Sequence, residues 1–169
     1  LSWNSLAALI TMKAGLVTVN TNPLYTAPEM EHQFADSGST GLVVIDLFAD
    51  RVAQVLPKTS IRTVGVVTIA DLLPFLSRTV VRAVQKYVKK QVPPVTFACT
   101  TFEAALAAGR RKLASGADPA VYLHGATADR VATLQYTGGT TGVSKGAVLT
   151  EGNLLANVAQ CIEVWKPGV

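Results

Sequence analysis

Along residues 1–70, the spacing of apolar residues is typical of a helix in some stretches and of a strand in others. The expected order is helix, strand, helix, strand, helix and strand, at residues 2–13, 16–19, 26–38, 40–46, 48–56 and 63–69. Gly15 ends the first helix, and Thr26 with Glu29 forms a capping-box pattern at the start of the second. Because helices and strands take turns along the chain, we expect an α/β fold: a layered, mostly parallel sheet with flanking helices.

A basic amphipathic helix is predicted over residues 72–92. The basic residues that gather on one side of its helical wheel are Arg78, Arg82, Lys86, Lys89 and Lys90. The apolar residues on the opposite side are Leu73, Leu76, Val80, Val84, Tyr87 and Val88. We favour a surface helix that docks on the protein through its apolar side, with contact to an anionic membrane as the alternative. Nucleic acid is a weaker candidate because no aromatic platform or reading motif accompanies the charge.

The C-terminal half of the chain combines helical and strand patterns. Residues 101–112 predict a helix, which a linker follows. Two β-prone runs at 131–136 and 147–149 predict the strands of a hairpin. Apolar spacing over 153–165 predicts a last helix and places Trp165 in the core.

The composition suits a buried core, since 49% of the 169 residues are hydrophobic and 15% are charged. The net charge is +4, and no carboxylate lies between Asp71 and Glu103. Cys99 and Cys161 are too few for a metal cluster or a disulfide framework, so we expect buried free thiols. No uncharged apolar stretch reaches the length of about 18 residues that a membrane-spanning helix needs. The chain begins with leucine inside a helical pattern, and we interpret it as an excerpt from a longer protein.

The candidate chemistry lies in the loop between the two β-prone runs. The loop and its edges contain Thr137, Gly138, Gly139, Thr140, Thr141, Gly142, Ser144, Lys145 and Gly146. Glycines give backbone N–H groups room to converge on an anion, and hydroxyl groups donate to phosphoryl oxygens. Lys145 adds a mobile positive charge. The pattern therefore predicts an anion-binding nest at the tip of a hairpin.

The two common glycine-loop motifs do not explain this stretch. A Walker A loop counted from Gly139 would need a glycine at Ser144 and a hydroxyl at Gly146, so it fails at two positions. The dinucleotide fingerprint fails because Gly138 and Gly139 are adjacent and no glycine lies two residues after either. A two-acid hydrolase is unsupported as well, because the carboxylates after Thr26 are spread around a helix and are not paired.

The order of residues in the loop resembles a known family. Residues 136–146, Tyr-Thr-Gly-Gly-Thr-Thr-Gly-Val-Ser-Lys-Gly, are similar to the signature loop of the adenylate-forming (AMP-binding) superfamily. Residues 19–26, Val-Asn-Thr-Asn-Pro-Leu-Tyr-Thr, also resemble its bacterial long-chain fatty acyl-CoA synthetase branch. The likeness covers nearly the whole chain and is weakest at 61–131. Ser144 departs from the usual proline or alanine, and Glu151-Gly152 departs from the usual His-Arg.

The resemblance implies that the chain is part of the large N-terminal domain of an acyl-activating enzyme. The expected portions are an α/β portion at 1–70, the basic amphipathic helix at 71–92, a helix and linker at 93–130, and the phosphate-loop hairpin with its following helix at 131–169.

The activity implied is that of a long-chain fatty acid–CoA ligase. ATP would activate a fatty acid to acyl-AMP, and coenzyme A would then form the thioester. Lys145 and Thr140 are the expected catalytic residues, with Lys145 facing the charge on the leaving pyrophosphate. The expected ATP-binding residues are Thr137, Gly138, Gly139, Thr140, Thr141, Gly142, Lys145 and Gly146. The resemblance places the ligand of Mg²⁺ outside this chain, so no metal ligand is expected within it.

Three alternatives remain open: another adenylate-forming ligase, such as a medium-chain or aryl-CoA ligase; a phosphate-binding NTPase or kinase; and a non-catalytic membrane-surface module. Fatty acid, ATP and coenzyme A are the expected partners, a homodimer is compatible with the sequence, and nucleic acid is not expected. We expect a cytoplasmic protein, with peripheral contact at the inner face of the membrane as an extension. The excerpt alone is expected to be inactive, because the later catalytic motifs of the relatives are missing from it.

Overall fold

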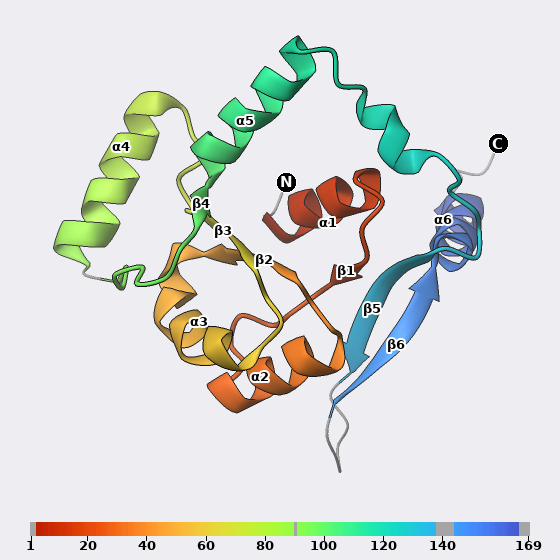
Figure 1. Ribbon diagram of the computed structural model, residues 1–169, viewed down its shortest axis with the longest axis horizontal. Coiled ribbons are helices and arrows are strands. Elements are labelled where there is room, and N and C mark those ends of the chain that lie inside the picture. The colour runs from red at the N-terminus through yellow and green to blue at the C-terminus, as the bar shows by residue number, and fades with distance from the viewer. Residues whose placement is uncertain (1–2, 90, 138–143, 166–169) are drawn as a thin grey trace. The chain divides into compact units, whose positions relative to one another are not determined.

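The computed structural model describes residues 3–89, 91–137 and 144–165. The chain divides into two compact units. Unit 1 combines the N-terminal segment Leu1–Asn20 with the C-terminal segment Asp118–Val169, and unit 2 is the continuous segment Thr21–Ala117 between them. Figure 1 shows the elements in chain order.

Unit 1 carries a three-stranded sheet in the order β1-β5-β6. Its elements are α1 (Trp3–Lys13), β1 (Thr18–Val19), a 3-10 helix (Pro119–Leu123), β5 (Val131–Thr137), β6 (Lys145–Thr150) and α6 (Glu151–Trp165). Strand β1 is parallel to β5, and β5 is antiparallel to β6. Gly15 ends α1 with a φ of +69°, a conformation that only glycine adopts at little cost. A Cβ there would lie 2.5 Å from the carbonyl oxygen of Tyr122.

Unit 2 carries a second three-stranded sheet, which is parallel throughout and runs in the order β2-β3-β4. Its helices and strands are α2 (Ala27–Asp36), β2 (Gly41–Ile45), α3 (Ala49–Val55), β3 (Thr63–Val67), α4 (Phe75–Ala83), β4 (Thr100–Thr101) and α5 (Phe102–Ala114). Short 3-10 turns at Asp46–Phe48 and Leu56–Lys58 flank α3, and a π-helical turn at Val84–Val88 continues α4. The crossover between β2 and β3 through α3 makes this part a βαβ unit.

The core of unit 2 lies between α2, α3 and the sheet. Met30, Phe34 and Val55 are buried together there, because α2 turns one apolar stripe toward α3. The start of α2 is held by its capping box, in which the backbone N–H and the hydroxyl of Thr26 donate to Glu29 Oε2 at 2.7 and 2.8 Å. The hydrogen bond from the backbone N–H of Thr26, followed by the weaker effect of its hydroxyl, holds the pKa of the Glu29 carboxyl below its ordinary value of 4.5.

The predicted fold class is confirmed, with differences in detail. The chain has mostly parallel strands with flanking helices, but they form two three-stranded sheets instead of one. The strand expected at 16–19 shrinks to Thr18–Val19, and the helix expected at 72–92 shrinks to Phe75–Ala83 plus the π turn. Pro74, directly before α4, accounts for its later start, because the residue before a proline avoids helical conformation.

The favoured orientation of the basic helix is wrong. Its apolar side is exposed: Leu76 keeps 77% and Val88 75% of its accessible surface. Arg78 and Arg82 face the protein instead, where each forms an ion pair with a carboxylate of unit 2. Two buried-position predictions are wrong too, because Trp165 keeps 83% of its surface and both cysteines are exposed free thiols. Within the described residues, no helix has the length and apolar character needed to cross a membrane.

Candidate functional site

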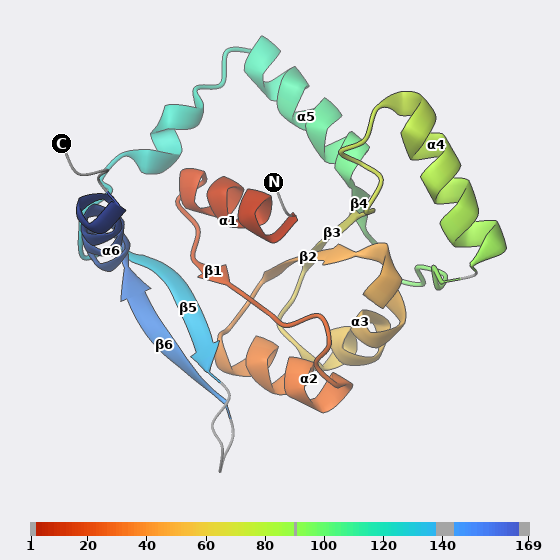
Figure 2. The same cartoon turned by 180° about the vertical axis from the view of Figure 1, so that it is seen from behind.

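The predicted hairpin is present. Strands β5 and β6 pair in antiparallel register, and Thr137 lies opposite Lys145 at the end from which the candidate loop departs. The β-prone runs on both sides of a glycine-rich stretch account for this local structure. Figure 2 shows β5 and β6 side by side, with α6 following at the far end of β6. The loop therefore joins two strands and does not open a helix, as expected.

Tyr136 and Gly146 form the next cross-strand pair of the hairpin. Tyr136 is buried, and its ring covers Gly146 so closely that a Cβ on the glycine would lie 3.0 Å from ring atoms Cε2 and Cζ. An aromatic ring over a cross-strand glycine replaces the packing that the glycine itself lacks. Tyr136 thus acts as a structural residue at the base of the loop, and Gly146 has a packing reason to be glycine.

Thr137 and Lys145 lie at the mouth of the loop. Both are exposed, so the hydroxyl and the ammonium group are available to an anion. A hydroxyl donor and a point positive charge on facing strand ends fit a phosphoryl group. Five further predicted site residues lie outside the described part of the chain: Gly138, Gly139, Thr140, Thr141 and Gly142.

Strand β1 supports the hairpin from its other edge. Thr18 lies opposite Thr133 in the parallel ladder, and the hydroxyl of Thr133 donates to the carbonyl oxygen of Thr18 at 2.8 Å. The hydroxyls of Thr18 and Thr11 also share a hydrogen bond, and Thr11 Oγ1 donates to Ala7 O at 3.0 Å within α1. The N-terminal segment is therefore tied to the strand that leads into the loop.

An ion pair closes the end of the hairpin opposite the loop. Arg130 Nε donates to Glu151 Oε1 at 2.8 Å, and Nη2 donates to the same oxygen. Both side chains are about three-quarters buried, with 24% and 22% of their surface exposed. The backbone reinforces the contact, because Glu151 N–H donates to Arg130 O at 2.9 Å and Gly152 N–H to Ala128 O at 2.8 Å.

Sequence reasoning missed this pair. In the sequence, Glu151-Gly152 stands out only as a departure from a basic pair, and the partner Arg130 lies 21 positions earlier in the chain. The structure explains both residues. The charge of Glu151 is matched by Arg130, and a Cβ at residue 152 would lie 3.0 Å from Ala128 O, so glycine fits best. The one available signal was an isolated arginine at the start of the first β-prone run.

Helix α6 begins directly after β6 with a reciprocal cap. Thr150 N–H donates to Asn153 Oδ1 at 3.0 Å, and Asn153 N–H donates to Thr150 Oγ1 at 3.2 Å. Each side chain thereby satisfies a backbone donor of the other residue. The two residues together therefore cap the start of α6.

The described residues offer no metal centre. Among residues 3–89, 91–137 and 144–165, no three histidine, cysteine, aspartate or glutamate side chains lie together as metal ligands would.

Comparison with known proteins decides the family. Residues 2–168 match the family model described as AMP-binding enzyme. The chain belongs to the AMP-binding enzyme family. A long-chain-fatty-acid–CoA ligase of Salmonella typhimurium is 41% identical over 157 residues, which is 92% of this chain and 27% of that protein. The corresponding ligase of Haemophilus influenzae has the same identity and coverage.

A solved structure agrees with this membership. The crystal structure of a long-chain-fatty-acid–CoA ligase from Archaeoglobus fulgidus superposes with a TM-score of 0.55 at 26% identity, over 94% of this chain and 24% of that one. The chain thus spans about a quarter of the length of the AMP-binding enzymes that it matches.

Proposed function

We propose that the parent protein of this chain is a long-chain fatty acid–CoA ligase that uses ATP. The observation that carries the proposal is the hairpin of β5 and β6, which brings Thr137 and Lys145 to one end of the candidate phosphate loop. Membership of the AMP-binding enzyme family and the likeness to bacterial ligases support the substrate class. The chain would supply the ATP-phosphate site of the enzyme.

The proposed reaction has two steps. First, a carboxylate oxygen of the fatty acid attacks the α-phosphorus of ATP, the bond to the β-phosphate oxygen breaks, and pyrophosphate leaves with the negative charge. The sulfur of coenzyme A then attacks the acyl carbon, AMP leaves, and the thiol proton passes to solvent. The protein's part in the first step is to position the phosphates and stabilise charge on the leaving group.

We assign that part to the loop. Lys145 would face the pyrophosphate charge, and Thr140 and Thr137 would donate hydroxyl hydrogen bonds to phosphoryl oxygens. Backbone N–H groups of Gly138, Gly139, Thr141, Gly142 and Gly146 would complete the cradle. Mg²⁺, which neutralises phosphate charge in such reactions, would be held by residues outside this chain.

The runner-up is another adenylate-forming ligase, for a medium-chain or aryl acid. It would use the same phosphate loop, so the acid that supports pyrophosphate release separates the two. A phosphate-binding NTPase or kinase would instead hydrolyse or transfer phosphate without any acid to activate. We further propose a cytoplasmic enzyme, and leave a homodimer to be tested by sedimentation of the parent protein.

Pyrophosphate release by the parent protein tests the proposal. Wild type, Lys145→Ala and Gly139→Val are compared for palmitate-dependent release and for ATP binding by calorimetry. We expect Lys145→Ala to slow release by about 10²–10³-fold, the usual effect of removing one charge-stabilising donor. Lys13→Ala, at the exposed end of α1, is the matched control and should behave as wild type. Unchanged release in both loop variants would show that the loop is only a turn.

A further inference from the structure

A cavity lies at the carboxyl ends of strands β2 and β3 in unit 2. The two strands are parallel, with Ile45 opposite Val67, and Asp46 and Thr68 directly follow this pair of residues. Asp46 and Thr68 both line the cavity, whose volume is about 590 Å³. Sites for small molecules have volumes of about 300–1,000 Å³, and in open parallel sheets they lie at this end of the strands. The place and the size of the cavity therefore suit a small ligand.

Helix α4, its π turn and the chain that follows supply further walls of the cavity. These walls contain Arg82 of α4, Gln85 and Tyr87 of the π turn, and then Pro93 and Pro94. π-helical turns are rare, and they occur frequently at functional sites. The tyrosine ring and the two prolines give the cavity an apolar and partly aromatic lining, which is usual where a protein binds a small molecule.

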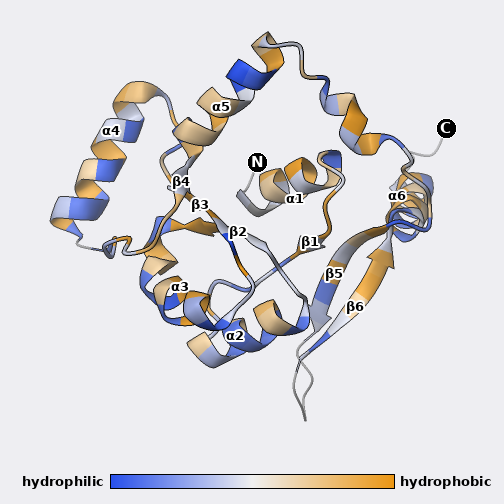
Figure 3. Cartoon of the chain, viewed as in Figure 1, coloured by the Kyte–Doolittle hydropathy of each residue, from blue (hydrophilic) through white to orange (hydrophobic). Residues whose placement is uncertain are grey.

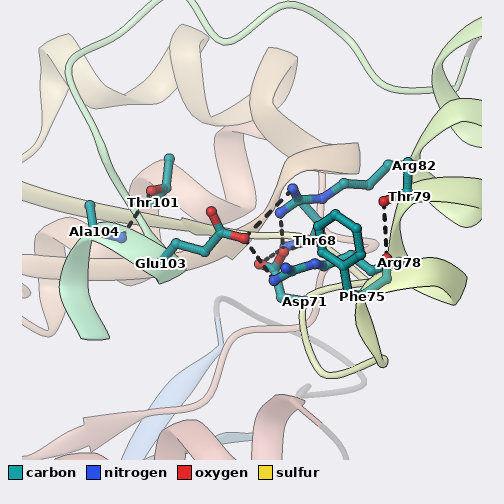
Figure 4. A network of polar contacts seen from close by, with 9 residues as sticks. All are labelled: Thr68, Asp71, Phe75, Arg78, Thr79, Arg82, Thr101, Glu103 and Ala104. Carbon is teal, nitrogen blue, oxygen red and sulfur yellow. Dashed lines mark hydrogen bonds and ion pairs between the residues drawn. The ribbon is translucent and has the colours of Figure 1, made fainter. Parts of the chain in front are cut away.

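Ion pairs hold α4 beside this cavity. Hydrophobic and hydrophilic stretches alternate along the helix (Figure 3), and two of its arginines pair with carboxylates of the same unit. Arg82 Nη2 pairs with Asp71 Oδ1, and Arg78 Nη1 lies 2.7 Å from Glu103 Oε1 (Figure 4). Asp71 is buried and accepts hydrogen bonds from the backbone N–H and the hydroxyl of Thr68 at 2.8 and 2.6 Å. These contacts fix the Arg82 side chain in the cavity wall in advance, which lowers the cost of binding a ligand.

Two buried polar atoms at the cavity lack a hydrogen-bond partner among the described residues, namely Asp46 Oδ1 and Arg82 Nε. Asp46 keeps only 9% of its accessible surface, so bulk water reaches its carboxyl group poorly. Burial raises the pKa of Asp46, and the charge of Arg82 opposes this rise because the two groups are close. Buried polar groups are nearly always paired, and an unpaired one costs stability. One acceptor and one donor therefore remain for a ligand.

The two unpaired atoms define the chemistry of that ligand. Asp46 Oδ1 needs a hydrogen-bond donor, and Arg82 Nε needs an acceptor. An anion would pair with Arg82 but repel the carboxylate of Asp46, and a cation would pair with Asp46 but meet the charges of Arg82 and Lys86. One water molecule would satisfy both atoms, yet its volume of about 30 Å³ would leave most of the cavity unfilled. A neutral ligand with a donor next to an acceptor satisfies both atoms and also fills the apolar part.

We propose that this cavity binds a neutral, planar ligand with an amide-like edge, in which an N–H group stands beside an oxygen or nitrogen acceptor. The N–H group donates to Asp46 Oδ1, the acceptor receives the hydrogen of Arg82 Nε, and the ring lies against Tyr87 and the prolines. Aromatic carboxamides and nucleobases both carry such an edge. The residues of the cavity belong to unit 2, whereas strands β5 and β6 belong to unit 1. The inference therefore does not rest on the proposed ligase activity.

Ligand-observed NMR of the full-length parent protein tests this proposal. Saturation transfer from the protein to benzamide and to cytosine is titrated, with benzoate and benzylamine as charged probes of similar size. We expect at least one neutral probe to bind, and to bind about tenfold more tightly than either charged probe. A carboxamide ligand predicts the stronger response from benzamide, and a nucleobase ligand predicts the stronger response from cytosine.

Two variants locate the binding. Asp46→Ala removes the acceptor, and Arg82→Lys keeps the positive charge that pairs with Asp71 but removes the Nε donor. Each variant should weaken binding of the neutral probe by about tenfold or more, the effect of losing one hydrogen bond to a charged group. The matched control is Asp50→Ala, which removes an exposed aspartate from α3 and should bind as wild type.

Circular dichroism of each variant must show the helix content of the wild-type parent. If Asp46→Ala fails to fold, Arg82→Lys alone decides, because it retains the ion pair with Asp71. The proposal is overturned if neither neutral probe binds or if a charged probe binds equally well. It is also overturned if the folded variants bind the neutral probe like wild type, since the probe would then occupy another site.

Discussion

Gly146 combines an observed packing role with a proposed role in phosphate binding. Its proposed role is to help form the phosphate cradle, yet its position under the ring of Tyr136 already requires a glycine. We expect Gly146→Ala to destabilise the chain by about 1–3 kcal/mol, because the added methyl group lies 3.0 Å from a buried ring that cannot easily move. Urea denaturation measures this change.

Two companion variants separate the roles of Gly146. Gly109→Ala on α5 adds a methyl group that meets nothing within 4 Å, so it should stabilise the chain by about 0.5–1 kcal/mol. Gly146→Ala combined with Tyr136→Leu removes the steric conflict and should recover part of the stability. If the parent carrying this pair also regains pyrophosphate release, Gly146 matters for packing alone and its assignment to the cradle is wrong.

Asp46 is a buried acid with an incomplete set of partners. Its side chain is 9% exposed, and Oδ1 finds no hydrogen-bond partner among the described residues. Burial raises the pKa of Asp46 above its ordinary value of 3.8, and the carboxylate of Asp71 raises it further, while the Leu47 N–H and Arg82 lower it. The folded chain therefore binds this proton more tightly than the unfolded chain.

The raised pKa of Asp46 predicts a pH dependence of stability. The contribution of Asp46 is fully present below pH 3.8 and is lost as pH rises through the higher folded-state pKa, because the unfolded chain releases the proton first. Asp46→Asn removes this loss, so we expect its free energy of unfolding to exceed that of wild type by about 1 kcal/mol at pH 7. The difference between variant and wild type, followed by urea denaturation from pH 7 downward, should shrink toward acid. A constant difference would contradict the explanation.

At the level of elements, the hairpin is held at both ends by different means. Tyr136 packs near the loop, whereas Arg130 and Glu151 join the start of β5 to the start of α6. Removing one partner of a largely buried pair leaves the other charge unmatched in a region of low dielectric. We expect Glu151→Ala to cost about 2–3 kcal/mol of stability, measured by urea denaturation.

A double-mutant cycle isolates the contact between Arg130 and Glu151. Arg130→Ala combined with Glu151→Ala should cost less than the sum of the single changes, with a coupling of about 1–2 kcal/mol. The exchange Arg130→Glu with Glu151→Arg retains one charge of each sign and should recover stability that either single reversal loses. Additive single and double changes would mean that the backbone hydrogen bonds alone hold this end of the hairpin.

Elements set by neighbouring residues could be predicted from the sequence. Thr26 and Glu29 are three positions apart and together predict the start of α2. Gly15 predicts the end of α1, where it has a positive φ. The hairpin was predictable because β-prone runs flank a glycine-rich stretch and its register involves residues close in sequence. In each case the residues that decide the structure lie in the same segment of the chain or in adjoining segments.

The orientation of α4 could not be predicted in the same way. A helical wheel tells which residues share a face, but it does not tell which face meets the protein. That choice depends on Asp71 and Glu103, which lie outside α4 and meet it only in the folded unit. The pairing of Arg130 with Glu151 escaped for the same reason, since 21 positions separate the two residues.

At the scale of the whole molecule, the proposed function would be divided between this chain and the rest of the parent. The chain spans about a quarter of the length of its relatives. The residues that the structure describes include a hydroxyl and an ammonium group at the mouth of the loop but no cluster of metal ligands. Phosphate positioning without magnesium, adenine and acid sites would bind an anion weakly and activate nothing. Stabilisation of the transition state would require the phosphate, magnesium, adenine and acid sites to act together.

We therefore expect the 169-residue polypeptide to form no acyl-CoA from ATP, palmitate and coenzyme A. The parent protein, assayed in parallel at equal concentration, should form it. Far-ultraviolet circular dichroism of the polypeptide must first show the helices of the described structure, so that inactivity is not merely unfolding. Folded but inactive polypeptide would place the missing chemistry in the remaining segments, since positioning of phosphate alone does not create an acyl donor. Robust acyl-CoA formation by the polypeptide would instead mean that these residues contain a complete active site.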